Sequence, residues 1–198
     1  LNYVSPLINN VGFALAVEKL MGIETPARCQ YIRVIMSELS RLTDHLTCLG
    51  ANAMELSAFT VYFYLINARE ALYRLTDSVA GGRITPAYTR VGGLTRDLSP
   101  DFKSAAAEVF KIVRKNISDA DKLLTRNRIF YDRLRGTGSI SKEDAVSLAF
   151  TGPALRSTGV PLDVRKATPY LVYDRFDFDI PVGSNGDNYD RYLVRMEE

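Results

Sequence analysis

The chain has 198 residues, of which 46% are hydrophobic and 24% charged, and its formal net charge is +2. This length can bury one substantial core and also allows two smaller domains. So small a charge excess argues against a nucleic-acid surface, which normally presents a clustered basic face. No run of about 20 apolar residues is present, so we expect no segment that crosses a membrane.

The cysteine and histidine content limits the chemistry available to the chain. Cys29 and Cys48 fall in one predicted helix, about 28 Å apart at ~1.5 Å per residue, so they cannot form a disulfide there. Neither belongs to a CxxC pair, and the single histidine, His45, is too few for a histidine-based metal site. Nucleotide-binding, serine-hydrolase and zinc-protease motifs are also missing from the sequence. We therefore expect reduced thiols and no bound metal.

Several of the predicted helices are marked by residues that begin or end them. Pro6 can begin the first helix because its missing N–H would be unpaired there, and Gly22 can end it. Thr25 is expected to cap the long second helix, Thr60 the third, and Ser141 a later short one. The predicted ranges are 6–22, 26–55, 60–81, 100–126, 128–134, 141–150 and 187–198.

The segments between the helices are expected to be irregular. Residues 82–98 carry paired glycines, which predicts a loop with at most a short extended piece. Near the C-terminus, Phe176, Phe178 and Ile180 alternate with Asp177 and Asp179, which predicts a half-buried strand or hairpin arm.

We therefore expect one mainly α domain over residues 1–198, with a long-helix bundle over 1–135 and an irregular, short-strand segment over 136–198. Since the chain begins at residue 1 with leucine and ends inside a helical pattern, we expect it to be a piece of a longer protein.

Two stripes run along the long helix at 26–55. The first is apolar and should face the core; it consists of Ile32, Met36, Leu39, Leu42, Leu46, Leu49 and Ala53. The second lies one residue behind, is polar at its start and small in its last third; it consists of Arg33, Ser37, Ser40, Asp44, Thr47, Ala51 and Glu55. Two interpretations stay open. Either the last three residues line a cavity that an acid closes, or the stripe is a solvated face.

Other polar residues also allow two interpretations. The charges at Arg156, Asp163, Arg165 and Lys166 could clamp an anion, but we favour paired structural charges that fix an irregular backbone. Tyr3 can donate a hydrogen bond or a proton, or it can simply pack.

Five stretches of the chain, taken in order, resemble the quinone-site (D-type) subunit of respiratory NADH:quinone oxidoreductase, complex I. They span nearly the whole sequence and read ALAVEKLMGIETPARCQYIRVIMSELSRLTDHLTCLGANAMELSAFT, GGRITPAYTRVGGL, NRIFYDRLRGTGSIS, TGPALRSTGVPLDVRKATPY and DIPVGSNGDNYDRYLVRMEE. That family is similar to the large subunit of nickel–iron hydrogenases, so the resemblance implies a hydrogenase-large-subunit-like helical bundle. Hydrogenases hold their metal with a CxxC pair near the start of this region. Here residues 1–5 contain no cysteine, so no metal is expected.

The resemblance implies a pocket for a quinone headgroup. Tyr3 matches the tyrosine that hydrogen-bonds the quinone carbonyl, and a positioned phenol can supply a proton to a reduced quinone oxygen. Thr47 and Ala51 match residues that line the pocket. Glu55 matches an acidic residue, usually aspartate, that pairs with a histidine and relays its proton. The expected catalytic residues are thus Tyr3 and Glu55, and the expected quinone-binding residues are Tyr3, Thr47, Ala51 and Glu55.

The sequence departs from the family pattern in several places. The histidine partners of Tyr3 and Glu55 belong to an N-terminal hairpin that lies outside these 198 residues, so we expect the isolated chain to be inactive. Glu55 is one methylene longer than the usual aspartate. Asn2 stands where aspartate is common, and Val61 where proline is favoured.

The resemblance also implies the surroundings of the chain. The substrate would be ubiquinone or menaquinone, while NAD, FMN and iron–sulfur clusters would lie only in partner subunits. The main partners would be the subunit with the terminal 4Fe–4S cluster and the membrane subunit that forms the quinone channel. The chain would be peripheral to the cytoplasmic face of a bacterial inner membrane, or to the matrix face in mitochondria. The rival interpretations are a non-catalytic helical scaffold and a true hydrogenase, against which the missing cysteines argue.

Overall fold

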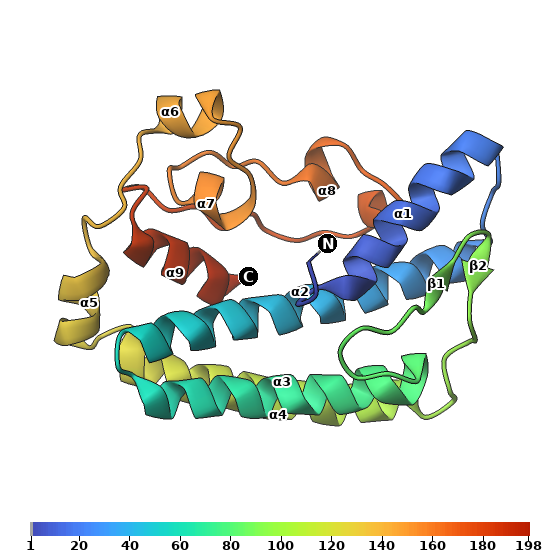
Figure 1. The fold of residues 1–198 in the computed structure, drawn as a ribbon, viewed down its shortest axis with the longest axis horizontal. Helices are drawn as coiled ribbons and strands as arrows, with labels where there is room; N and C mark the ends of the chain where they lie inside the picture. The colour runs from blue at the N-terminus through green and yellow to red at the C-terminus, as the bar shows by residue number, and fades with distance from the viewer. Residues whose placement is uncertain (1) are drawn as a thin grey trace. The chain divides into compact units, whose positions relative to one another are not determined.

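The computed structural model describes residues 2–198, and this part of the chain is mainly α, as predicted (Figure 1). The predicted helices are all found, with ends within about three residues of the predicted ranges. Three short helical turns between residues 152 and 175 were not predicted. The elements are α1 (Pro6–Met21), α2 (Ala27–Glu55), α3 (Phe59–Ala80), β1 (Thr89–Arg90), β2 (Gly93–Leu94), α4 (Phe102–Leu124), α5 (Arg128–Leu134), α6 (Lys142–Ser147), α7 (Gly152–Arg156), α8 (Val164–Ala167), the 3-10 turn η1 (Tyr173–Arg175) and α9 (Asn188–Glu197).

The chain divides into two compact units, each of which combines separate stretches of sequence. The first unit contains the described residues up to Cys48 together with Phe63–Asn116, and the second contains Leu49–Tyr62 and Ile117–Glu198. The first unit therefore holds α1, most of α2, α3 and α4, and the β1–β2 hairpin. The second holds α5 to α9 and the remaining ends of the long helices. That residues 1–198 form one domain stays a prediction.

Helix α1 begins and ends where the sequence predicts. Pro6 occupies the first turn, and Gly22 follows the helix in the left-handed conformation (φ 67°), with its N–H donating to Glu18 O. One face of α1 is buried, and this face includes Leu7, Val11 and Glu18. The apolar side chains hold the helix in the first unit, while the buried carboxylate requires a partner.

Gly12 lies in the middle of α1 at an exposed position, and a Cβ added there would meet nothing within 4 Å. Glycine costs conformational entropy in a helix interior that alanine does not. Gly12→Ala is therefore expected to raise the free energy of unfolding by about 0.5–1 kcal/mol, measured by urea denaturation of the 198-residue chain. A loss of stability would contradict the open surroundings of this position.

The apolar stripe of α2 faces the core, as predicted. Ile32, Met36, Leu39, Leu46, Leu49 and Ala53 are each at most 3% exposed, and only Leu42 is half-buried. The helix begins one residue later than expected, because Pro26 O accepts the first backbone bond from Gln30 N (3.2 Å). After Glu55 the chain bends through Ser57 in the left-handed conformation (φ 67°).

The β strands lie in the loop at 89–94, and the strand predicted near the C-terminus is wrong. Thr89 pairs with Leu94 and Arg90 with Gly93 in an antiparallel hairpin. Residues 176–180 are irregular instead. The Phe178 ring there is covered by cationic side chains rather than by a neighbouring strand, since its centroid lies 4.5 Å from the Arg165 guanidinium carbon. Alternation of apolar and polar residues predicts a strand only where a second strand is available to pair.

The second unit is held together around α9, which contacts α5 and α7 (Figure 1). The Tyr131 and Tyr189 rings meet edge to face with centroids 4.9 Å apart, as do those of Phe130 and Tyr192. Burial raises the pKa of Tyr192 to about 12, and its hydroxyl lies 2.8 Å from Thr125 Oγ1. Aromatic pairs of this kind add stability beyond the area they bury.

Side-chain caps fix the helix starts in the second unit. Ser141 accepts a hydrogen bond from Asp144 N (3.0 Å), which confirms its predicted capping role. Asp187 caps α9 in the same way through Asp190 N (2.9 Å).

Within residues 2–198, none of the helices has the length and apolar character needed to cross a membrane.

Candidate functional site

Tyr3 lies in a turn that two asparagine side chains tie to the start of α1. Asn2 Oδ1 accepts a hydrogen bond from Val4 N (3.1 Å), and Asn2 Nδ2 donates to Ser5 Oγ (2.7 Å). Asn9 donates from Nδ2 to Asn2 O (3.2 Å) and to Ser5 O (3.0 Å). Tyr3 itself is 70% exposed. The turn is thus fixed to α1, while the phenol is accessible.

Thr47 lies on α2 with its hydroxyl proton committed to its own helix. Thr47 Oγ1 donates to Thr43 O (2.7 Å), and Thr43 Oγ1 donates in the same way to Leu39 O (2.8 Å). A donating hydroxyl keeps its lone pairs, so Thr47 can still accept a hydrogen bond. Its half-buried side chain therefore suits a lining residue that faces a donor.

Ala51 and Glu55 belong to the last turns of α2. Ala51 is half-buried, and Glu55 is exposed and ends the helix. A carboxylate is unfavourable at the negative end of a helix dipole. A cation is available at this end, because Arg133 donates from Nη1 to Leu56 O (3.0 Å).

The four predicted site residues are divided between the two units. Tyr3 and Thr47 belong to the first unit, and Ala51 and Glu55 to the second. The spacing of four residues puts Thr47, Ala51 and Glu55 on one face of α2. That Tyr3 joins them in one site stays a prediction.

The second stripe of α2 is not a solvated face over its first half. Arg33, Ser37 and Ser40 are 0%, 3% and 4% exposed, so that interpretation is wrong for this part of the helix. Towards its end the stripe becomes half-buried and then exposed at Glu55. The polar residues of the first half are therefore interior groups, and the charged one among them must be paired.

The partner of Arg33 is Glu18 on α1, and the two side chains form a bidentate pair. Arg33 Nη1 donates to Glu18 Oε2 (2.8 Å) and Nη2 to Oε1 (2.6 Å). The pair also holds the β1–β2 turn, because Gly92 N donates to Glu18 Oε1 (2.8 Å). Arg33 Nη2 donates in addition to Arg90 O (3.0 Å) and Gly93 O (3.1 Å). We call Glu18 and Arg33 the buried clamp.

The electrostatics of the clamp follow from its geometry. The hydrogen bond from Arg33 is the largest influence on Glu18 and holds the pKa of its carboxyl below the ordinary value, although burial acts in the opposite direction. The same bond raises the pKa of Arg33. Burial raises the pKa of the neighbouring Cys29 thiol. Both clamp residues are therefore charged at neutral pH.

Sequence reasoning identified Arg33 as a member of the stripe but missed Glu18. The available signal was its spacing: Glu18 follows Val11 and Ala14 on the buried face of α1. An acid on an apolar face predicts a buried cation opposite it.

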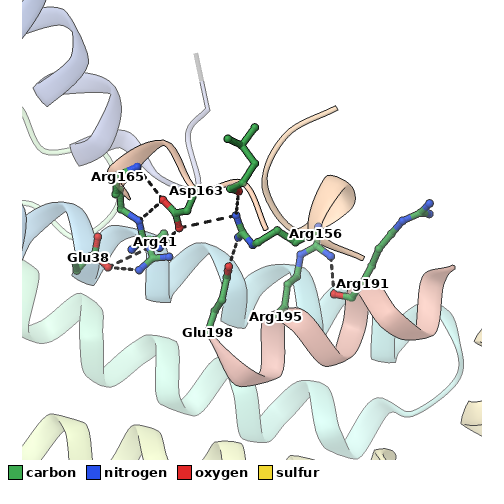
Figure 2. A network of polar contacts seen from close by, with 9 residues as sticks. Glu38, Arg41, Arg156, Asp163, Arg165, Arg191, Arg195 and Glu198 are labelled. Carbon is green, nitrogen blue, oxygen red and sulfur yellow. Dashed lines mark hydrogen bonds and ion pairs between the residues drawn. The ribbon is translucent and has the colours of Figure 1, made fainter. Parts of the chain in front are cut away.

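The charges near the C-terminus form a structural network in the second unit (Figure 2). Arg165 donates from Nε to Asp163 Oδ1 (2.9 Å) and from Nη2 to Asp163 Oδ2 (2.5 Å). Arg156 bonds to Glu198 and donates from Nη1 to Leu162 O (3.1 Å). The four charged side chains are each at most 10% exposed. The prediction of paired charges that fix an irregular backbone is confirmed for Arg156, Asp163 and Arg165, whereas Lys166 is exposed and lies 3.9 Å from the exposed Asp177.

Potential metal ligands are scattered through the chain. Among residues 2–198, no three His, Cys, Asp or Glu side chains come together as a metal site would require. Cys29 and Cys48 are thiols that form no disulfide in the described part of the chain, and His45 is half-buried on α2. The clamp and the C-terminal network organise their charges by ion pairing.

Together, these features define a mainly α chain in which buried ion pairs organise the polar interior of each unit. The family model for the respiratory-chain NADH dehydrogenase 49 kDa subunit matches residues 55–198, and the chain belongs to this family.

Named relatives match the chain over its whole length, and each is a D-type subunit of NADH-quinone oxidoreductase. The chain is 55% identical over 198 residues to one from Sorangium cellulosum (strain So ce56), with 100% of this chain and 49% of the relative covered. It is 57% identical to one from Anaeromyxobacter sp. (strain K), with 100% and 46% covered. For the relative from Myxococcus xanthus (strain DK1622) the identity is 54%, with 100% and 48% covered. The chain thus spans about half the length of the curated relatives it matches.

Proposed function

We propose that this chain belongs to the quinone-binding subunit of an NADH:quinone oxidoreductase and helps to couple quinone reduction to proton translocation. The observation that carries the proposal is the placement of Tyr3. Its phenol is accessible, yet its turn is tied to α1 by the hydrogen bonds of Asn2 and Asn9. A fixed backbone under an accessible phenol is what positioned proton donation requires.

The proposed chemistry divides the work among the four site residues. A quinone that accepts two electrons must gain a proton at each oxygen. Tyr3 donates a hydrogen bond to one carbonyl oxygen and passes its proton there as negative charge develops. Thr47, whose oxygen can accept, faces the hydroxyl of the reduced product, and Ala51 leaves room for the ring. Glu55 returns a proton to the phenolate together with a histidine outside this chain.

The proposal includes the partners of the assembled complex. The substrate is ubiquinone or menaquinone, and an iron–sulfur cluster in a partner subunit supplies the electrons. NAD and FMN bind elsewhere in the complex. The chain is peripheral to the membrane and adjoins the membrane subunit that forms the quinone channel. The iron–sulfur subunit, the membrane subunit and the rest of the quinone-binding subunit complete the site, so the 198-residue chain alone is inactive.

Tyr3→Phe in the assembled complex tests the proposal. Because the variant keeps the ring but removes the proton, decylubiquinone turnover is expected to fall roughly tenfold to a hundredfold. NADH oxidation by ferricyanide, which needs no quinone site, should stay unchanged. Tyr64→Phe, which alters a phenol on α3 that is 36% exposed, serves as the matched control.

The alternative is a non-catalytic helical scaffold. It is favoured by the apolar residues exposed on α1, where Phe13, Leu20 and Met21 are 67%, 87% and 64% exposed. Such residues suit a contact with another protein. Unchanged decylubiquinone turnover in Tyr3→Phe would support this alternative and reject the quinone-site assignment.

A further inference from the structure

We propose that Glu18 and Arg33 are positioning residues for quinone reduction: the buried clamp fixes α1 on α2 and thereby sets where Tyr3 stands. This inference rests on the proposed function, in which Tyr3 meets the quinone. Neither clamp residue touches the quinone. Their effect on the reaction passes through the placement of α1.

The clamp joins three elements of the first unit and has one well-defined arrangement. Both carboxylate oxygens of Glu18 accept from the Arg33 guanidinium, and Oε1 accepts from Gly92 N as well. The same guanidinium serves two carbonyl oxygens of the hairpin, those of Arg90 and Gly93. A bidentate pair constrains angle as well as distance, because two parallel bonds resist rotation. The clamp therefore fixes α1 against both α2 and the β1–β2 turn.

The geometry of α1 transmits this constraint to Tyr3. Glu18 lies in the last turn of α1, and Tyr3 lies in the turn before its first residue, to which Asn9 ties it. At ~1.5 Å per residue the two positions are about 20 Å apart. A tilt of α1 by about 5° at the clamp would move the Tyr3 turn by about 2 Å. A displacement of about 1 Å can cost a catalytic group roughly a hundredfold in rate.

A second ion pair in the same unit provides a matched comparison. Arg28 on α2 donates from Nε and Nη2 to Asp97, which follows β2, with distances of 2.9–3.1 Å. The pair thus also connects α2 to the hairpin region and is also bidentate. Its side chains are 68% and 59% exposed, so solvent screens it, and among the described residues its hydrogen bonds join only α2 and the segment after β2. It should not control the position of Tyr3.

The experiment compares Glu18→Gln with Asp97→Asn in the assembled complex, each in the parent background and together with Tyr3→Phe. Glu18→Gln is expected to lower kcat/KM for decylubiquinone by at least about fivefold in the parent background. In the Tyr3→Phe background the same substitution should cost less than about twofold, because the group it misplaces is already missing. Asp97→Asn should leave kcat/KM for decylubiquinone unchanged in both the parent and the Tyr3→Phe backgrounds. Ferricyanide reduction and the amount of assembled complex serve as controls for the remaining parts of the enzyme.

Each outcome decides the inference. A loss of kcat/KM on Glu18→Gln that is smaller in the Tyr3→Phe background than in the parent background supports a positioning role, and a larger loss there overturns it. Equal losses in both backgrounds, or unchanged quinone kinetics, overturn it while leaving the role of Tyr3 intact. If Tyr3→Phe alone leaves quinone turnover unchanged, the proposed function fails and the positioning role fails with it. If Glu18→Gln does not accumulate in the complex, Glu18→Asp carries the same test, since it keeps the charge but shortens the reach to Arg33 and Gly92.

Discussion

Gly186→Ala is expected to lower the free energy of unfolding of the 198-residue chain by about 3 kcal/mol or more. Gly186 has a φ of 65°, a conformation that is costly for residues with a Cβ. An added Cβ would also lie 2.3 Å from Ile140 O and 3.2 Å from Thr158 Cγ2. The backbone cannot move away easily, because Gly186 N donates to Ser157 O (2.9 Å) and Gly186 O accepts from Ile140 N (3.2 Å).

Gly152→Ala separates the two causes of this loss. Gly152 has a similar φ of 60°, but a Cβ added there would meet nothing within 4 Å. It should therefore show only the conformational cost of about 1 kcal/mol. Urea denaturation of both variants measures the difference. Similar losses in the two would show that the close approach to Ile140 O is relieved by a small backbone shift.

The helices could be predicted because their signals are local. Pro6 and Gly22 bound α1, and Ser141 caps α6, as the sequence indicated. Each of these residues acts on backbone groups within a few positions of itself. Such interactions can be read from neighbouring letters of the sequence.

The interior of the first unit could not be predicted in the same way. Spacing placed Arg33 on a stripe of α2, but a stripe does not reveal what faces it. The structure supplies Glu18 from α1 and carbonyl oxygens from the hairpin, and these partners make a buried guanidinium tolerable. The strand predicted at 176–180 failed for the related reason that pairing depends on a distant segment. The candidate site residues came from the family resemblance, and their exposure and hydrogen bonds came from the structure.

The C-terminal network shows how local and distant contacts combine. Asp163 caps α8 by accepting from Arg165 N (2.9 Å), which is a local interaction. The same carboxylate pairs with the Arg165 side chain and lies 4.0 Å from Arg156 Nη1. Asp163 thus pairs closely with Arg165 and lies at the edge of ion-pair range from Arg156, whose closer carboxylate is that of Glu198.

Asp163→Asn is therefore expected to destabilise the 198-residue chain by about 3 kcal/mol at neutral pH, because the amide keeps the cap but removes the charge that faces both arginines. The exposed Asp132, which lies 3.4 Å from Arg128, is the control. Asp132→Asn should leave stability nearly unchanged, since exposed pairs contribute little. Equal losses in the two variants would contradict the structural role of the network.

The difference in stability between the parent chain and Asp163→Asn is expected to depend on pH in a defined direction. Burial acts to raise the pKa of Asp163, but the hydrogen bonds and charges of Arg165 and Arg156 outweigh it, so the pKa in the folded chain lies below the ordinary value. A lowered folded pKa stabilises the folded state at any pH where the unfolded carboxyl is ionised. The advantage of the parent chain over Asp163→Asn should be constant above about pH 5 and shrink as the pH falls below about 4. Urea denaturation of both chains from about pH 3 to about pH 7 measures the difference in their free energies of unfolding. A difference that grows as the pH falls would contradict a lowered pKa of Asp163 in the folded chain.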